Sequence, residues 1–176
     1  MERRERLKRR ANRRSRQDRI WHILRVLTTY NDLYCSQNFY EYRDNLRSFN
    51  ESIIALANAN ITKRDYEIAL RFCDFKFRRG KCDRSITQAE KDFLLSGKNI
   101  EVNCPEILKA VIVSFRNYWE DVLISYKKAS ARKNRLNYLV DKLGEVKDWP
   151  EICNDIDAVK EISDLQAFYS EQANQM

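Results

Sequence analysis

Glycine and proline are almost absent from this chain, whose 176 residues contain three glycines and two prolines. Average usage would give roughly 21 such residues in a chain of this length. Because glycine and proline form most β-turns and sharp strand corners, their scarcity disfavours sheet architectures. A hydrophobic content of 43%, with 3 Trp, 9 Tyr and 8 Phe, is too high for a disordered chain. We therefore expect an all-α protein, a helical bundle of about five or six helices.

Hydrophobic spacing predicts where several of these helices lie. Apolar residues from Phe39 to Leu56 recur at alternating intervals of three and four, which is typical of a helix that packs by one face. Thr62 followed by Asp65 has the pattern of a helix start, and we expect Gly80 to end that helix. A short helix is expected over residues 87–96.

The C-terminal half is expected to contain one long helix. From Pro105 to Gly144 no residue interrupts the apolar pattern, so we expect a single helix over about residues 105–143. At 1.5 Å per residue it would be on the order of 57 Å long, more than a compact bundle needs. Its far end would then project or form a homodimer. Pro150 is expected to open the last helix.

The positive charge of the chain is concentrated at one end. Residues 1–25 hold eleven Lys and Arg against three acidic residues, a net charge of +8, whereas the remaining 151 residues hold 22 basic and 23 acidic residues. This asymmetry is typical of a basic arm for a polyanion, attached to a nearly neutral body. We expect residues 1–25 to be an arginine-rich arm and residues 26–176 to be a single α-helical domain.

The basic residues of the arm point to nucleic acid as the ligand. On a helix they would surround every side and leave no apolar face for packing, so we expect the arm to be disordered until phosphates neutralise it. Arginine outnumbers lysine, and each guanidinium matches two phosphate oxygens or stacks on an unpaired base. In this bias the arm resembles arginine-rich helical peptides that bind structured RNA, which favours RNA over DNA. The predicted contact residues of the arm are Arg3, Arg4, Arg6, Lys8, Arg9, Arg10, Arg13, Arg14, Arg16 and Arg19.

Two further basic clusters are candidates for extending this surface. The first, Arg78, Arg79 and Lys81, flanks Gly80, and phenylalanines interleave with it. The second, Lys128, Arg132 and Arg135, has the spacing of one outward helix face. For either cluster, an ordinary solvated helix face is the alternative interpretation.

No motif indicates catalysis. The sequence contains no glycine-rich phosphate loop, no HExxH and no GxSxG, and His22 is the only histidine. Five irregularly spaced cysteines without a CxxC pair do not predict a zinc site. We expect no enzyme, no metal and no cofactor. The odd cysteine count predicts reduced thiols, with Cys35 and Cys73 as small core residues, in the cytoplasm or nucleus.

Two functions remain open at this point. The first is binding of RNA or DNA, by the protein alone or as a small subunit of a larger nucleoprotein complex. The second is a helical adaptor or regulatory subunit that docks on other proteins, with a basic arm that serves as a nuclear-import signal or solubilising tail. A membrane partner is not expected, because residues 1–19 lack the bulky apolar face of an interfacial helix and no uncharged apolar run approaches about 18 residues.

Overall fold

The computed structural model describes residues 2–77 and 105–176, with side chains described for residues 4–71 and 105–176. Within these ranges the chain forms six α-helices and no strand, which confirms the predicted all-α fold. Of the described residues, 2–35 and 44–77 belong to one compact unit, and 36–43 and 105–176 belong to a second. In the described ranges, no helix combines the length and the apolar character that crossing a membrane requires. An arm followed by one domain over residues 26–176 stays a prediction.

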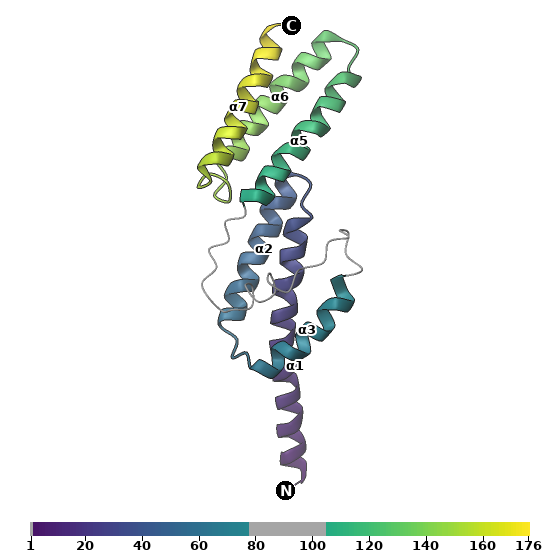
Figure 1. Cartoon of the computed structure of the whole chain (residues 1–176), viewed down its shortest axis with the longest axis vertical. Coiled ribbons are helices and arrows are strands. Elements are labelled where there is room, and N and C mark those ends of the chain that lie inside the picture. The colour runs from purple at the N-terminus through teal and green to yellow at the C-terminus, as the bar shows by residue number, and fades with distance from the viewer. Residues whose placement is uncertain (1, 78–104) are drawn as a thin grey trace. The chain divides into compact units, whose positions relative to one another are not determined.

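The first unit is built on helix α1 (Glu2–Tyr34), with α2 (Phe39–Ala57) and α3 (Lys63–Phe77) beside it (Figure 1). The apolar stripe of α2 is confirmed, because most of its members are buried. Thr29 on α1 and Ser52 on α2 share a hydrogen bond of 2.9 Å between their hydroxyls, and α1 also contacts α3. The core side chains of this unit include Ile23, Val26, Leu27, Leu33, Leu46, Phe49 and Leu56.

The second unit contains α5 (Pro105–Ser125), α6 (Ala129–Lys147) and α7 (Ile156–Asn174). Figure 1 shows these three helices side by side, each running opposite to the one before it. The first residues of α2 also belong to this unit, where the ring of Phe39 lies 5.0 Å from that of Phe115. The fully buried side chains of this unit include Leu108, Leu136, Leu139, Leu143, Ile152, Ile162 and Tyr169.

The prediction of one helix over residues 105–143 is wrong. Helix α5 ends at Ser125 and α6 begins at Ala129, although neither glycine nor proline marks the break. Because α6 folds back beside α5, the apolar stripes of both helices are buried in one core. A continuous helix would leave part of this apolar surface exposed to water. The projecting helix end on which the expected homodimer rested is therefore absent.

The start of the last helix also differs from the prediction. Residues after Pro150 form turns, in which the amides of Ile152 and Cys153 donate to the carbonyl of Trp149. Helix α7 begins at Ile156 instead, because the Asp155 carboxylate accepts a hydrogen bond of 3.0 Å from the amide of Ala158. Aspartate is a strongly preferred residue at this capping position. The predicted end at Gly80 and the short helix over residues 87–96 lie outside the described residues.

The prediction of reduced thiols is wrong at Cys35. This half-buried residue follows the end of α1 and is disulfide-bonded, and its partner lies outside the residues whose side chains are described. Cys153 is a free thiol and is exposed. Because stable disulfides are rare in reducing compartments, the expected cytoplasmic or nuclear location loses the support it drew from the cysteines.

Candidate nucleic-acid interface

The basic arm is the N-terminal part of α1 and continues without a break into the helix that fills the first core. The expectation that it is disordered alone differs from the structure, which is helical from Glu2. The physical reason lies in Ile23, Val26 and Leu27, which are fully buried and hold the second half of α1 in place. Extending an existing helix costs far less than nucleating one, so the arm propagates from this anchored segment.

Exposed cations cover the arm from Arg4 to Arg14. No apolar face packs against the rest of the unit there, because even Leu7 is 58% exposed. Glu5 is the one acidic residue within this stretch. The side chain of Arg3 is not described. Seven cationic side chains of the stretch are exposed, and we call them the exposed arm cations: Arg4, Arg6, Lys8, Arg9, Arg10, Arg13 and Arg14.

The last two arginines of the predicted set have an acidic partner. Arg19 donates through Nε to Oδ2 of Asp65, with 2.7 Å between the two atoms, and Nη1 of Arg19 donates to the hydroxyl of Ser15 over 2.7 Å. Nε of Arg16 lies 3.8 Å from Oδ1 of the same carboxylate. Asp65 is almost completely buried, with 1% of its side chain exposed. Arg16 and Arg19 therefore anchor the arm.

Asp65 is held in place by its own helix start. The amide and hydroxyl of Thr62 donate to Oδ2 of Asp65 over 3.0 and 2.7 Å, and the amide of Asp65 donates to the Thr62 hydroxyl over 3.3 Å. This reciprocal arrangement is a capping box, as the sequence pattern predicts. Burial by itself would raise the pKa of Asp65, but the hydrogen bonds from Arg19 and Thr62 outweigh it and lower the pKa to about 2. The carboxylate is therefore charged at neutral pH.

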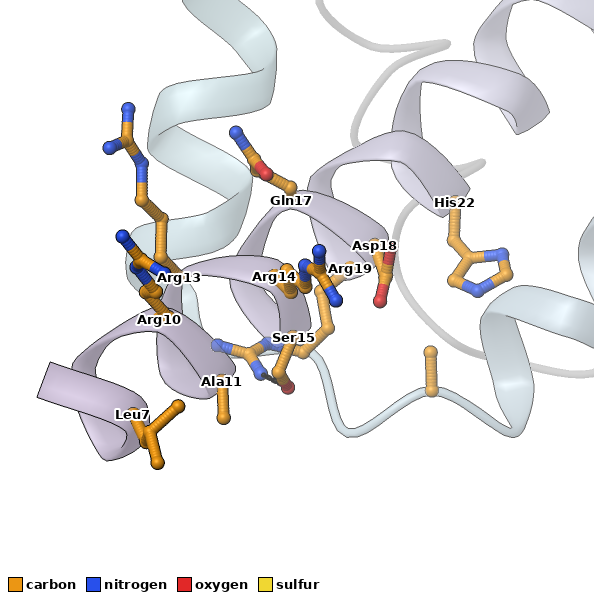
Figure 2. A pocket seen from close by; sticks show the side chains of 11 residues that line it. Leu7, Arg10, Ala11, Arg13, Arg14, Ser15, Gln17, Asp18, Arg19 and His22 are labelled. Carbon is orange, nitrogen blue, oxygen red and sulfur yellow. Dashed lines mark hydrogen bonds between the residues drawn. The ribbon is translucent and has the colours of Figure 1, made fainter. Parts of the chain in front are cut away.

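A shallow groove of about 980 Å³ runs along this part of α1. In Figure 2, Leu7 and Ala11 lie at one end and His22 lies at the other. Four arginines line it (Arg10, Arg13, Arg14 and Arg19) against a single acid, Asp18. Among the described residues that line the groove, Ala59 in the turn before α3 is the one that comes from outside α1. The groove is thus an open basic face of the arm rather than an enclosed pocket.

The second basic cluster is only partly where the sequence places it. Lys128 is exposed at the N-cap of α6, but Arg132 is half-buried, with its Nε shielded from solvent. Arg135 does not lie on an outward face. Its Nε and Nη2 donate to the Tyr126 hydroxyl over 3.2 and 3.1 Å, and its guanidinium lies 5.4 Å from the ring centroid of Trp119. Arg78, Arg79 and Lys81 lie outside the described residues.

Sequence reasoning missed Asp65 as the residue that anchors the arm. The capping pattern was visible, but it identifies Asp65 only as the start of a helix. No local signal pairs it with arginines 46 and 49 residues earlier in the chain. Asp65 meets Arg16 and Arg19 only because the fold packs α3 against α1.

No protein-family model, curated protein or solved structure matches this chain.

Proposed function

We propose that this protein binds nucleic acid, RNA in preference to DNA, through the exposed arm cations of α1. The observation that carries the proposal is the exposure of seven cationic side chains on a helix with one acid among them. A polyanion neutralises such a surface and releases its own counterions, which makes binding favourable and dependent on salt. The protein would act alone or as a small subunit of a nucleoprotein complex.

Two groups of arm residues have different roles in this proposal: one positions the helix and the other binds the ligand. Arg16 and Arg19 are engaged by Asp65, so they position the helix. The exposed arm cations precede Arg16 and Arg19 on the same helix and present their side chains to solvent. Because the arm is already helical, binding would not have to supply the free energy that orders it. Phosphate contacts of this kind fix orientation and contribute little sequence specificity.

The preference for RNA rests on the chemistry of arginine. A guanidinium donates in a planar fork to phosphate oxygens and also stacks on an unpaired base, which a lysine ammonium does not do. Bulged and looped RNA offers such bases, whereas duplex DNA stacks them inside the helix. Six of the seven exposed arm cations are arginines.

A salt titration of binding tests the proposal. A labelled RNA hairpin and a DNA duplex of equal length are titrated with the full chain, between about 50 and 200 mM salt, by fluorescence anisotropy. The test variant replaces Arg9, Arg10, Arg13 and Arg14 by glutamine. The salt slope is the slope of log affinity against log salt concentration. Removing four phosphate contacts should reduce its magnitude by about 3.6 on duplex DNA, and by less on single-stranded segments.

A charge-matched variant controls for loss of net charge. It replaces four exposed basic residues outside the arm by glutamine: Lys63, Arg64, Arg71 and Lys160. We expect it to keep the wild-type salt slope, and the wild type to prefer the hairpin over the duplex. The same salt slope for the arm variant and the charge-matched variant would contradict the proposal. It would favour a protein–protein adaptor with an import or solubilising arm.

A further inference from the structure

A groove lined mainly by aromatic rings lies in the second unit, separate from the residues of the arm. Its volume is about 610 Å³. It forms where the first turn of α2 meets α5 and α6. Six aromatic side chains line it: Phe39, Tyr40, Phe115, Tyr118, Trp119 and Tyr138. Two aliphatic side chains, Leu139 and Val146, complete the apolar part.

Several of these rings remain accessible although they are held in place. Tyr118 is 62% exposed, Tyr138 46% and Tyr40 43%. The ring of Tyr118 meets Trp119 at an interplanar angle of 81°, with 5.2 Å between centroids, and Trp119 meets Tyr138 at 56°. Edge and tilted contacts of this kind orient a ring without covering both of its faces. A flat molecule can therefore stack on the preoriented and most exposed of these rings, that of Tyr118.

Cations surround the same rings. The Arg135 guanidinium lies 5.2 Å from the ring centroid of Tyr138, and Nζ of Lys142 lies 4.8 Å from that of Tyr40. Lys142 also pairs with Glu145, which is not among the lining residues, over 2.8 Å. Among the described residues that line the groove there is no acidic side chain, whereas Lys142 lines it, together with the amides of Gln37 and Asn38. Arg135 and Lys142 beside the rings, with no carboxylate in the described lining, favour an anionic ligand over a cationic one.

We infer that this groove stacks unpaired bases of a single-stranded nucleic acid. Tyrosine and tryptophan faces bind bases by stacking, nearby Lys and Arg attract the phosphates, and side-chain amides can hydrogen-bond base edges. A proline-rich peptide also docks on aromatic-lined grooves. It offers no phosphates to Lys142 and Arg135, so these two cations favour a nucleic acid as the occupant. The inference rests on the proposed function, since it assigns the arm and the groove to the same ligand.

Binding of unstructured oligouridine compared with a blunt DNA duplex tests the inference. The full chain carries Tyr118→Ala, and Kd is measured for both probes by fluorescence anisotropy at one salt concentration. Loss of one stacked base should weaken oligouridine binding roughly 5- to 150-fold. The duplex, which offers no unpaired base, should bind with unchanged affinity. Tyr118→Phe keeps the ring and should retain the wild-type affinity for oligouridine.

Phe168→Ala is the matched control. Phe168 is an aromatic residue on α7 that is 41% exposed and does not line the groove, so its removal should leave both affinities unchanged. Far-UV circular dichroism confirms that each variant is helical. Photocrosslinking of 4-thiouridine in the same oligonucleotide should label Tyr118 or Trp119 in the wild type, and this labelling should disappear from Tyr118→Ala.

The two proposals fail in different ways. If the glutamine variant of the arm binds as the wild type does, while Tyr118→Ala loses oligouridine, then the arm proposal is wrong and the groove still binds bases. If the arm variant loses affinity and Tyr118→Ala changes nothing, the groove inference is overturned alone. Equal weakening of oligouridine and duplex by Tyr118→Ala would also overturn it, because stacking on unpaired bases predicts a difference.

Discussion

Arg19 and Asp65 are 46 residues apart in the chain, and their side chains form an ion pair with 2.7 Å between Nε and Oδ2. The pair joins the base of the arginine-rich arm to the first turn of α3. It fixes how α1 is rotated about its own axis relative to α3, and with it the direction in which the exposed arm cations point. The orientation of the proposed binding surface therefore depends on a buried carboxylate that binds no ligand itself.

Breaking this ion pair should destabilise the fold. Asp65→Asn weakens the contacts of Arg19 and of the Thr62 cap together, so we expect a loss of about 1–3 kcal/mol in the free energy of unfolding. Arg19→Gln should cost a similar amount, because it leaves a buried carboxylate with fewer donors. Urea unfolding at neutral pH measures both. The double variant should show a coupling energy of about 0.5–3 kcal/mol.

Arg64→Gln provides the control for these variants. Arg64 is exposed on the first turn of α3, so its replacement should change stability by no more than about 0.5 kcal/mol. Strictly additive effects of Arg19→Gln and Asp65→Asn would show that the two side chains do not interact.

The same carboxylate should make stability depend on pH in the acid range. The pKa of Asp65 is lowered to about 2 in the folded protein, from an ordinary value of 3.8. A group whose pKa is lowered by folding stabilises the fold above its unfolded pKa, and this contribution is lost as the pH falls through the folded pKa. Its share of stability should therefore be complete above about pH 4 and decline towards pH 2.

The measurement is the free energy of unfolding from pH 6 down to pH 2, for the wild type and for Asp65→Asn. We expect the difference between the two proteins to shrink below pH 4, since protonated aspartic acid and asparagine are both neutral. A constant difference over the whole range would contradict the assigned pKa.

Arg135 should stabilise the turn between α5 and α6. It donates two hydrogen bonds to Tyr126 and lies over the rings of Trp119 and Tyr138. Removing these contacts by Arg135→Ala should cost about 1–3 kcal/mol. Arg135→Lys should restore little, because an ammonium does not reproduce the planar fork. Thermal unfolding measures the effect, and Lys128→Ala, at an exposed position, should leave the midpoint nearly unchanged.

The cysteines should differ in reactivity. Because Cys35 is disulfide-bonded and Cys153 is an exposed free thiol, alkylation of the native protein without reductant should label Cys153 and not Cys35. Reduction under denaturing conditions should make Cys35 reactive, as peptide mass spectrometry can show. Cys35→Ser should lower stability by about 2–4 kcal/mol, the usual effect of losing a disulfide. Labelling of Cys35 before reduction would contradict the assignment.

Residue types and their spacing along the chain were enough to predict the class of the fold and the faces of several helices. The scarcity of glycine and proline predicted helices, and the spacing from Phe39 to Leu56 identified side chains that are buried in α2. The concentration of charge in the first 25 residues singled out the candidate site. These features are local, because helix periodicity and charge density are set by neighbours along the chain.

Three features depend on long-range packing: the end of α5, the place of Arg135 among aromatic rings and the role of Asp65 in holding the arm. The helix break carries no glycine or proline, and it forms because folding back buries two apolar faces that a continuous helix would leave exposed. The ion pair of Arg19 with Asp65 joins residues whose proximity depends on packing α3 against α1. Contacts between distant segments are set by burial of surface in three dimensions, and a local sequence pattern does not contain that information.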